Sequence, residues 1–305
     1  NEIRKHSEKG FDKIYNLLNV SFTETTGQSH FSEKGKMIVV EALKKGIAKQ
    51  EDDQAVYVPF QDRKKFILRS NQTASYITQD LGAAVERYKK YKFEKMIYVV
   101  DFRQSDHFSD LFTILKMLGY DFSKNCHHLA FGTVKFENEI FATRKGKIIL
   151  LEEVLQRTIQ KANEEIKKRK TEGNAEKVGV GAVKYAFLKN EPIKEINFSW
   201  DVLNFDGNTG PYLQYSYARA SSIIKKSKKK AKHTIPDNLT EKEILLIKKI
   251  ADFPQEVNKA EEKLDPSIIA HYAYHLAQIF NEFYHSEKVI GTDKEDFRLK
   301  LVDAF

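Results

Sequence analysis

Cysteine is nearly absent from this sequence, and its scarcity excludes several kinds of site. The 305 residues contain one cysteine, Cys126, so the chain has neither an internal disulfide nor a pair of cysteines to hold zinc. A lone thiol suits a reducing compartment, so we expect a cytoplasmic protein. We find no apolar run long enough to span a bilayer, and the chain opens on Glu2, Arg4 and Lys5, unlike a signal peptide. We therefore expect no membrane partner.

The composition combines ample apolar material with a surplus of positive charge. Hydrophobic residues make up 41% and charged residues 31%, which suits a packed core and a solvated surface in one large or two ordinary domains. The 51 basic and 43 acidic residues give a net charge of +8. This surplus favours anionic partners, RNA among them, although many soluble proteins carry a similar charge.

Apolar patterns predict an α/β region in the first part of the chain. Helical spacing predicts helices within 1–50 and over 80–91, 108–118 and 148–167. Within 1–50 the expected apolar faces are Phe11, Ile14, Leu17 and Leu18, and Met37, Val40 and Leu43. Alternation over 55–69 predicts a hairpin. The apolar runs 96–100 and 128–131 read as buried parallel strands joined by a right-handed helical crossover.

The remainder of the chain has an all-helical pattern. No strand signal follows residue 211, and helices are predicted over 211–226, 240–261 and 266–288, which fit a bundle. A boundary near residue 205 therefore divides an α/β part, 1–205, from an all-α part, 206–305. In the last of these helices an apolar stripe favours bundle core over stacking on RNA bases. It consists of Tyr272, His275, Leu276, Ile279, Phe280, Phe283 and Tyr284.

The junction between the two parts carries the most informative string. Residues 205–219 read Phe-Asp-Gly-Asn-Thr-Gly-Pro-Tyr-Leu-Gln-Tyr-Ser-Tyr-Ala-Arg. Turn residues predict a helix start at Gly207, Gly210 and Pro211. One helix face then carries Tyr212, Tyr215 and Ala218 or Arg219. The string resembles the junction between the catalytic and anticodon-binding domains of arginyl-tRNA synthetases, and three upstream segments resemble the same family in the same order.

The first of these segments, residues 70–84, passes from a polar turn into a helix. If the helix includes Tyr76, then Tyr76 and Asp80 face the same way, one turn apart. A guanidinium is bound by a carboxylate, such as that of Asp80, and by an aromatic face, such as that of Tyr76. The alternative is that Asp80 is an acid favoured at a helix start and that Tyr76 is a core aromatic. The segment resembles the family's Tyr-x-x-x-Asp motif, which implies that Tyr76 and Asp80 bind L-arginine. Gln79 stands where many members have arginine.

The second segment, residues 101–108, follows the expected strand at 96–100. Open α/β sheets bind ligands at the carboxyl ends of their strands, so Gln104 and His107 are well placed for binding. The alternative, which is equally favoured, is that Gln104 is a turn residue and that the His107 ring packs beside Phe108. The segment resembles the family's Gln-x-x-His-Phe motif. That resemblance implies that Gln104 contacts arginine and that His107 contacts ATP.

The third segment joins Phe131 and Gly132 to the basic loop 142–146. Cations and a hydroxyl on a loop suit a triphosphate, although an exposed basic turn is the commoner meaning of such a pattern. The loop resembles the family's form of the class I signature, Ser-Thr-Arg-Lys-Gly, with Ala142 in place of the first serine. The resemblance implies catalytic roles for Thr143, Arg144 and Lys145. It also implies ATP contacts from Phe131, Gly132 and Lys145, together with His107.

Two segments of the all-α part bear on RNA. The densest positive run predicts tRNA contacts by phosphate neutralisation, with a solvated helix end as the equal alternative. Its lysines include Lys225, Lys226, Lys228, Lys229 and Lys230. Residues 277–284 resemble the Phe-Asn-x-Phe-Tyr segment of the family's anticodon-binding bundle.

The resemblance extends over nearly the whole chain and implies a function. It implies an arginine–tRNA ligase in which a partial Rossmann-like nucleotide-binding domain precedes an all-α anticodon-binding bundle. Such an enzyme uses ATP with Mg²⁺ as substrate, forms arginyl-adenylate from L-arginine and transfers the arginine to tRNA(Arg). The resemblance further implies a monomer with no permanently bound cofactor and no protein-held metal.

One family signature, His-x-Gly-His, is missing from this sequence. We therefore interpret the chain as a central-to-C-terminal portion of a longer synthetase, incomplete at its last helix, and expect it to be inactive alone. An incomplete sheet predicts an unpaired edge and exposed apolar surface. The alternative function is a module that binds RNA or arginine without adenylation activity.

Overall fold

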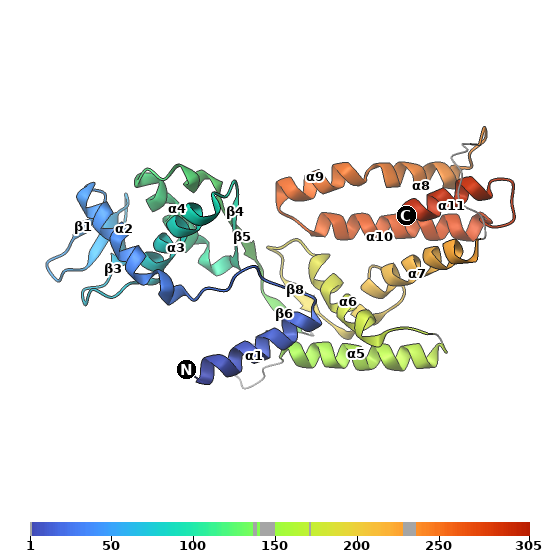
Figure 1. Ribbon diagram of the computed structural model, residues 1–305, viewed down its shortest axis with the longest axis horizontal. Coiled ribbons are helices and arrows are strands. Elements are labelled where there is room, and N and C mark those ends of the chain that lie inside the picture. Colours follow the sequence, from blue (N-terminus) through green and yellow to red (C-terminus); the bar gives the residue numbers. More distant parts are fainter. Residues whose placement is uncertain (1, 137–138, 141–149, 171, 228–235) are drawn as a thin grey trace. The chain divides into compact units, whose positions relative to one another are not determined.

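The computed structural model describes residues 2–136, 139–140, 150–170, 172–227 and 236–305 (Figure 1). The chain divides into two compact units, one comprising Phe22–Gly132 and the other joining Asn1–Ser21 to Thr133–Phe305. In the described part of the chain, no helix has both the length and the apolar character needed to cross a bilayer. The domain boundary expected near residue 205 falls inside the second unit and stays a prediction.

The unit Phe22–Gly132 contains an antiparallel sheet, a parallel strand pair and helices. Its elements are η1 (Gln28–Phe31), α2 (Ser32–Lys44), β1 (Lys49–Gln50), β2 (Val56–Pro59), β3 (Lys64–Leu68), α3 (Tyr76–Tyr91), β4 (Met96–Asp101), η2 (Phe102–Gln104), α4 (Ser105–Met117), η3 (Asp121–Asn125) and β5 (Cys126–Phe131), where η denotes a 3₁₀ helix. Strands β1, β2 and β3 pair antiparallel, and β4 pairs with β5 in parallel. The structure confirms the expected hairpin, both expected parallel strands and the helix that joins them.

Helices α2 and α3 approach each other closely through two glycines. A Cβ atom on Gly35 would lie 2.0 Å from the carbonyl oxygen of Thr78, and one on Gly82 would lie 2.5 Å from the Gly35 nitrogen. Only glycine permits backbones to come this near, so the two positions fix how the helices cross.

The buried face of α2 differs from the expected one. The structure buries Gly35, Ile38, Val39 and Ala42. Met37 is 65% exposed and Val40 is 50% exposed, so the predicted face at Met37, Val40 and Leu43 is wrong for its first two members. The close contact with α3 places the small residues inward, and this tertiary contact decides the rotation of the helix.

Strand β4 is apolar on both faces but buried on only one. Tyr98 is buried, with its ring 4.9 Å from that of Phe108 in α4. On the other face Ile97 is 40% exposed and Val99 is 62% exposed. The prediction of a strand buried on both faces is therefore wrong for β4. The predicted exposed apolar surface is confirmed, and within the described residues β4 and β5 have no third strand beside them.

The second unit combines a small sheet with helices. Its elements are α1 (Glu2–Leu17), β6 (Val134–Phe136), β7 (Glu139–Ile140), α5 (Leu151–Lys168), α6 (Ala175–Leu188), β8 (Ile196–Phe198), η5 (Trp200–Leu203), α7 (Gly210–Lys226), α8 (Glu241–Ala251), α9 (Phe253–Lys263), α10 (Ser267–Ser286) and α11 (Glu295–Ala304). Strand β6 pairs antiparallel with β7 and parallel with β8. The sequence patterns do not predict this sheet, because strands of two or three residues are too short to show alternation.

Helices α1, α5 and α6 share one apolar cluster with β8. Ile14 and Leu17 of α1 and Leu18, which follows it, pack against this cluster, as expected, but Phe11 is 56% exposed. The helix expected over 148–167 corresponds to α5, whereas α6 is not predicted.

From α7 onward the described chain is helical, as expected (Figure 1). The helices predicted over 211–226 and 266–288 correspond to α7 and α10. The helix predicted over 240–261 is instead two helices, α8 and α9, because Pro254 has no amide hydrogen to continue the hydrogen bonding of α8. Both helices lie along α10.

Helix α10 supplies much of the core of this helical region. Phe280 and Phe283 are fully buried and Tyr272 is 6% exposed, so the prediction of bundle core is confirmed for them. It is wrong for His275 and Tyr284, whose side chains are exposed. These two residues mark the edge of the stripe, where the helix turns toward solvent.

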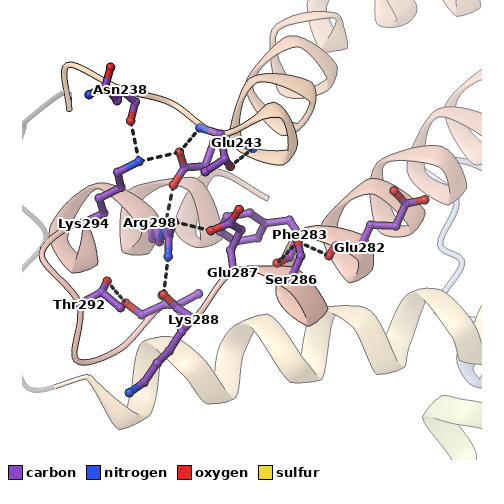
Figure 2. Close-up of polar contacts among 12 residues, drawn as sticks. Asn238, Glu243, Glu282, Phe283, Ser286, Glu287, Lys288, Thr292, Lys294 and Arg298 are labelled. Atoms are coloured by element: carbon purple, nitrogen blue, oxygen red, sulfur yellow. Dashed lines mark hydrogen bonds and ion pairs between the residues drawn. The ribbon is translucent and has the colours of Figure 1, made fainter.

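A buried network of charges joins α11 to α8 (Figure 2). The Arg298 guanidinium donates to Glu243 Oε1 at 2.7 Å, to Glu287 and to the backbone oxygen of Lys288 at 2.7 Å. The Lys294 ammonium lies 3.4 Å from Glu243 Oε2. The Glu243 side chain is 0% exposed and that of Arg298 is 8% exposed, so the attachment of α11 depends on balanced charge inside the fold.

Candidate active site

The parallel strands β4 and β5 end side by side. Asp101, the last residue of β4, pairs in register with Phe131, the last residue of β5. The chain then turns through η2 into α4, which places Gln104 and His107 at this end of the strands. Ligands of open α/β sheets bind at this edge. The expected position of both residues is thus confirmed, while their roles stay predictions.

The turn after β4 is fixed by its own ion pair. The Asp101 carboxylate accepts a hydrogen bond from the Arg103 backbone nitrogen at 2.9 Å, and its oxygens lie 2.8 and 2.7 Å from the Arg103 guanidinium. The Arg103 hydrogen bonds lower the pKa of Asp101 to about 2. Because this carboxylate is already paired, the acid at the strand end is a poor acceptor for a second guanidinium.

Asp80 and His107 form the central contact of the candidate site. His107 Nε2 lies 2.7 Å from Asp80 Oδ2, and the two side chains are 18% and 24% exposed, respectively. Ile77 and Leu81, beside Asp80 in α3, are buried and hold the helix against the core. The structure therefore brings together two residues that the sequence predicts from separate segments. A carboxylate with one oxygen at a histidine retains a second oxygen for a cation.

A stack of rings supports His107 from behind. The His107 ring meets Phe108 edge-on, with centroids 5.2 Å apart. Phe108 stacks on His128 of β5 at 4.6 Å, and His128 Nε2 lies 3.0 Å from the Val100 oxygen. The sequence does not single out His128, since only its pairing across the two strands shows which ring it meets.

The other two predicted arginine ligands lie at the surface. Helix α3 begins at Tyr76 behind a capping box formed by Ser75 and Thr78, which confirms that Tyr76 and Asp80 are one turn apart in a helix. Tyr76 is 69% exposed, and Gln104 is exposed as well. Neither side chain takes part in the Asp80–His107 contact.

The predicted nucleotide and tRNA residues are described in part. Phe131 is 41% exposed and Gly132 is buried. Lys225 and Lys226 are exposed in the last turn of α7. The remaining predicted residues lie outside the described residues: Thr143, Arg144, Lys145, Lys228, Lys229 and Lys230. Over the described ranges, no three His, Cys, Asp or Glu side chains are grouped to hold a metal ion.

A second polar cluster joins α7 to α10. The Arg219 guanidinium lies over two rings, 4.7 Å from the Tyr215 centroid and 4.6 Å from the Tyr284 centroid. It also donates to Asn281, whose amide nitrogen lies 3.1 Å from the Tyr212 hydroxyl. The predicted face of Tyr212, Tyr215 and Arg219 is confirmed by these shared contacts. Tyr284, which lies at the exposed edge of the apolar stripe of α10, thus takes part in this cluster.

Comparison with known proteins extends the likeness over the whole chain. Residues 1–200 match the family described as tRNA synthetases class I (R), catalytic domain, and residues 213–305 match the DALR anticodon binding domain. The arginine–tRNA ligase of Clostridium beijerinckii is 37% identical over 313 residues, and that of Halothermothrix orenii is 37% identical over 315 residues. Each alignment covers 99% of this chain and 56% of the relative.

Solved structures show the same fold. The arginyl-tRNA synthetase of Plasmodium falciparum superposes with a TM-score of 0.85 at 26% identity, covering 100% of this chain and 54% of that one. The Thermus thermophilus arginyl-tRNA synthetase superposes with a TM-score of 0.82 at 24% identity, covering 95% and 58%.

The fold and the two family matches define a class I tRNA synthetase chain, in which an α/β catalytic region with parallel strands precedes an all-helical anticodon-binding domain. Within that class, the chain belongs to the arginyl-tRNA synthetase family. It spans about half the length of the curated relatives that it matches, 56% in both alignments above.

Proposed function

We propose that this chain is the part of an arginine–tRNA ligase that recognises L-arginine and tRNA(Arg). The complete enzyme then activates arginine with ATP and Mg²⁺ to arginyl-adenylate and transfers the arginine to the tRNA. The observation that carries this proposal is the Asp80–His107 contact at the carboxyl ends of β4 and β5, in a chain of this family.

Asp80 is the acceptor for the substrate guanidinium in this proposal. Its carboxylate is 24% exposed, and a charge in such a site interacts more strongly with a partner than it would in water. His107 occupies one oxygen and thereby orients the other toward the substrate. The ring of Tyr76, one turn earlier, supplies the wall on which the guanidinium stacks, and Gln104 contacts the arginine backbone groups.

Adenylation joins the arginine carboxylate to the α-phosphorus of ATP and expels pyrophosphate. Negative charge moves onto the leaving phosphates as the bond breaks, so the reaction requires cations placed where that charge develops. Thr143, Arg144 and Lys145 supply a hydroxyl and two cations for this task, and His107, Phe131 and Gly132 contact the nucleotide. The His-x-Gly-His signature, which this sequence lacks, belongs to the other side of the reaction.

Replacement of Asp80 tests the arginine site. In the complete enzyme we expect Asp80→Asn to lower kcat/KM for arginine by a factor of about 30 or more, since losing one partner of such a charge pair costs about 2–5 kcal/mol. Asp106→Asn is the matched control, because Asp106 is an exposed acid one residue from His107. Pyrophosphate exchange dependent on arginine measures both. Near-normal exchange by Asp80→Asn would remove Asp80 from the arginine site.

A further inference from the structure

We propose that a groove between α5 and η5 binds one nucleotide of unpaired RNA, with the base on Trp200 and a phosphate on the basic residues of α5. The groove lies within the unit that joins Asn1–Ser21 to Thr133–Phe305. None of its residues belongs to the proposed arginine site, the proposed ATP site or the lysine run that begins at Lys225. The inference deepens the RNA-binding part of the proposed function and rests on it only for the identity of the natural RNA.

The groove has the size and the walls that a nucleotide requires. Its volume is about 690 Å³, within the range of small-molecule sites. One wall is the C-terminal half of α5, and the other is η5 with the residues that follow it, through Asp206. Trp200 and Phe205 are both partly exposed and both line the groove.

Each aromatic ring in the groove has a basic side chain above it, from α5 or from Arg169, the residue that follows α5. The Lys161 ammonium lies 4.7 Å from the Trp200 ring, and the Arg169 guanidinium lies 4.3 Å from the Phe205 ring. The Arg157 guanidinium also lies over the Trp200 ring, 5.7 Å from its centroid. A ring beside a cation suits a nucleotide, whose base stacks on the ring while its phosphate pairs with the cation.

The lining of the groove is balanced in charge, with Lys161, Lys168 and Arg169 beside Glu164, Glu165 and Asp206, and the surplus of positive charge comes from the rest of the surrounding helix. Between residues 157 and 170 the chain carries six basic and two acidic residues. Of the two acids, Glu165 pairs with Arg169 at 2.7 Å, and this hydrogen bond lowers the pKa of Glu165. Glu164 accepts a hydrogen bond from Gln160 at 3.1 Å. Lys161 and Lys168 also line the groove, together with the acid Asp206, and are the two cations placed to neutralise phosphate charge.

An unpaired nucleotide fits this arrangement better than an acidic peptide or a duplex. Carboxylates satisfy the cations, but a peptide rich in them brings no flat ring to stack on Trp200. The bases of a duplex are already stacked on one another and present only their edges. A single-stranded or looped RNA supplies both the phosphate and the free face of a base.

Trp200 is the only tryptophan of the chain, so its fluorescence reports on this groove alone. The 305-residue chain is titrated with octaadenylate at low and high salt, and binding is measured in parallel by the anisotropy of a labelled copy. We expect saturable quenching that follows the anisotropy curve and weakens as salt rises. Lys161→Gln should raise Kd at least about fivefold, because it removes the cation beside the ring. Lys167→Gln is the control, an equal charge change on the same helix outside the groove, and should raise Kd less than about twofold.

Three results would overturn the proposal. RNA binding without any change in Trp200 fluorescence would place the RNA elsewhere on the chain. Equal quenching by polyglutamate or by inorganic phosphate would show a general anion site. Equal effects of Lys161→Gln and Lys167→Gln would show that only net charge matters. The Asp80→Asn experiment measures arginine activation, and its outcome does not affect the fluorescence, the anisotropy or the Kd for RNA. A failure of the proposed function can therefore be told apart from a failure of this inference.

Discussion

At the scale of single residues, the network around Glu243 shows how a charge is kept inside the helical region. The carboxylate is 0% exposed and has three partners: the Thr240 backbone nitrogen at 2.7 Å, the Arg298 guanidinium at 2.7 Å and the Lys294 ammonium at 3.4 Å. The first partner belongs to the capping box that starts α8, and the other two belong to α11 and the residue before it. The Glu243 side chain thus caps the start of α8 and also binds α11 to it through ion pairs.

We expect Glu243→Gln to destabilise the protein strongly. The substitution leaves the Arg298 guanidinium buried with less compensating charge, and breaking a buried pair in this way costs about 3–5 kcal/mol. Urea unfolding at pH 7 measures the change in free energy. Glu282→Gln is the matched control, because Glu282 pairs with Lys242 at 2.5 Å but its side chain is 59% exposed. Exposed pairs contribute about 0–1 kcal/mol, so equal effects of the two substitutions would contradict this account.

The same carboxylate predicts a dependence of stability on acid. Burial alone would raise the pKa of Glu243, but the Thr240 backbone hydrogen bond and the Arg298 guanidinium outweigh it and hold the pKa below the ordinary value of 4.5. The stabilisation is therefore complete above pH 4.5 and is lost as the pH falls through the lower folded value. We expect the melting temperature of the native chain to fall more steeply between pH 5 and about pH 2 than that of Glu243→Gln. Parallel curves for the two proteins would show that Glu243 does not contribute to the acid sensitivity.

At the scale of helices and strands, the crossing of α2 and α3 depends on two positions without side chains. We expect Gly35→Ala to lower the free energy of unfolding by about 1–3 kcal/mol or more, because the added methyl group would meet the Thr78 backbone at 2.0 Å. Gly10→Ala in α1 is the control, since a Cβ atom there would meet nothing within 4 Å. That change should be neutral or stabilise by up to about 1 kcal/mol through helix propensity. Equal destabilisation by both would show that the close helix contact is not what matters.

The elements that the sequence predicts are those with a long, regular pattern. The hairpin, both parallel strands, α5, α7 and α10 follow from spacing alone. Helix α6 does not, because Gly179 and Gly181 interrupt its apolar face. Those glycines serve packing: a Cβ atom on Gly179 would lie 2.7 Å from the backbone of Ile159 in α5. The rotation of α2 could be predicted only by assuming that Gly35 contacts another helix. The residues around Gly35 in the sequence do not indicate this contact.

The candidate site shows the same division between local and long-range information. The spacing of Tyr76 and Asp80 and the position of His107 after β4 are local, and the sequence predicts both. The contact between Asp80 and His107 joins α3 to α4 and depends on how those helices pack. No periodicity reports such a contact, and the same is true of the stack that joins Phe108 to His128.

At the scale of the whole molecule, we expect this chain to bind substrates without activating arginine. Adenylate formation requires stabilisation on both sides of the reacting phosphate, and the sequence carries the Thr143, Arg144 and Lys145 side without the His-x-Gly-His side. Pyrophosphate exchange dependent on arginine, measured with the 305-residue chain, should stay at background. The complete enzyme under the same conditions is the positive control. Exchange above background by the chain alone would show that the missing signature is dispensable.

The net charge of +8 predicts that tRNA binding by the chain is governed by salt. Phosphate neutralisation releases counterions, so the logarithm of the binding constant should fall linearly with the logarithm of the salt concentration, by nearly one unit of slope for each phosphate contact. We expect the double variant Lys225→Gln with Lys226→Gln to reduce that slope by about two, because both lysines are exposed at the end of α7.

Lys259→Gln with Lys263→Gln in α9 is the matched control for this variant, since it removes the same charge from exposed positions of another helix. Phosphate contacts carry no sequence information, so tRNA(Arg) and other tRNAs should bind this chain with similar affinity if the lysines dominate. Filter binding across a salt series distinguishes the two possibilities. A strong preference for tRNA(Arg) that survives high salt would place recognition in specific contacts, for which Arg219, with its partners Tyr215, Asn281 and Tyr284, is then the first cluster to replace.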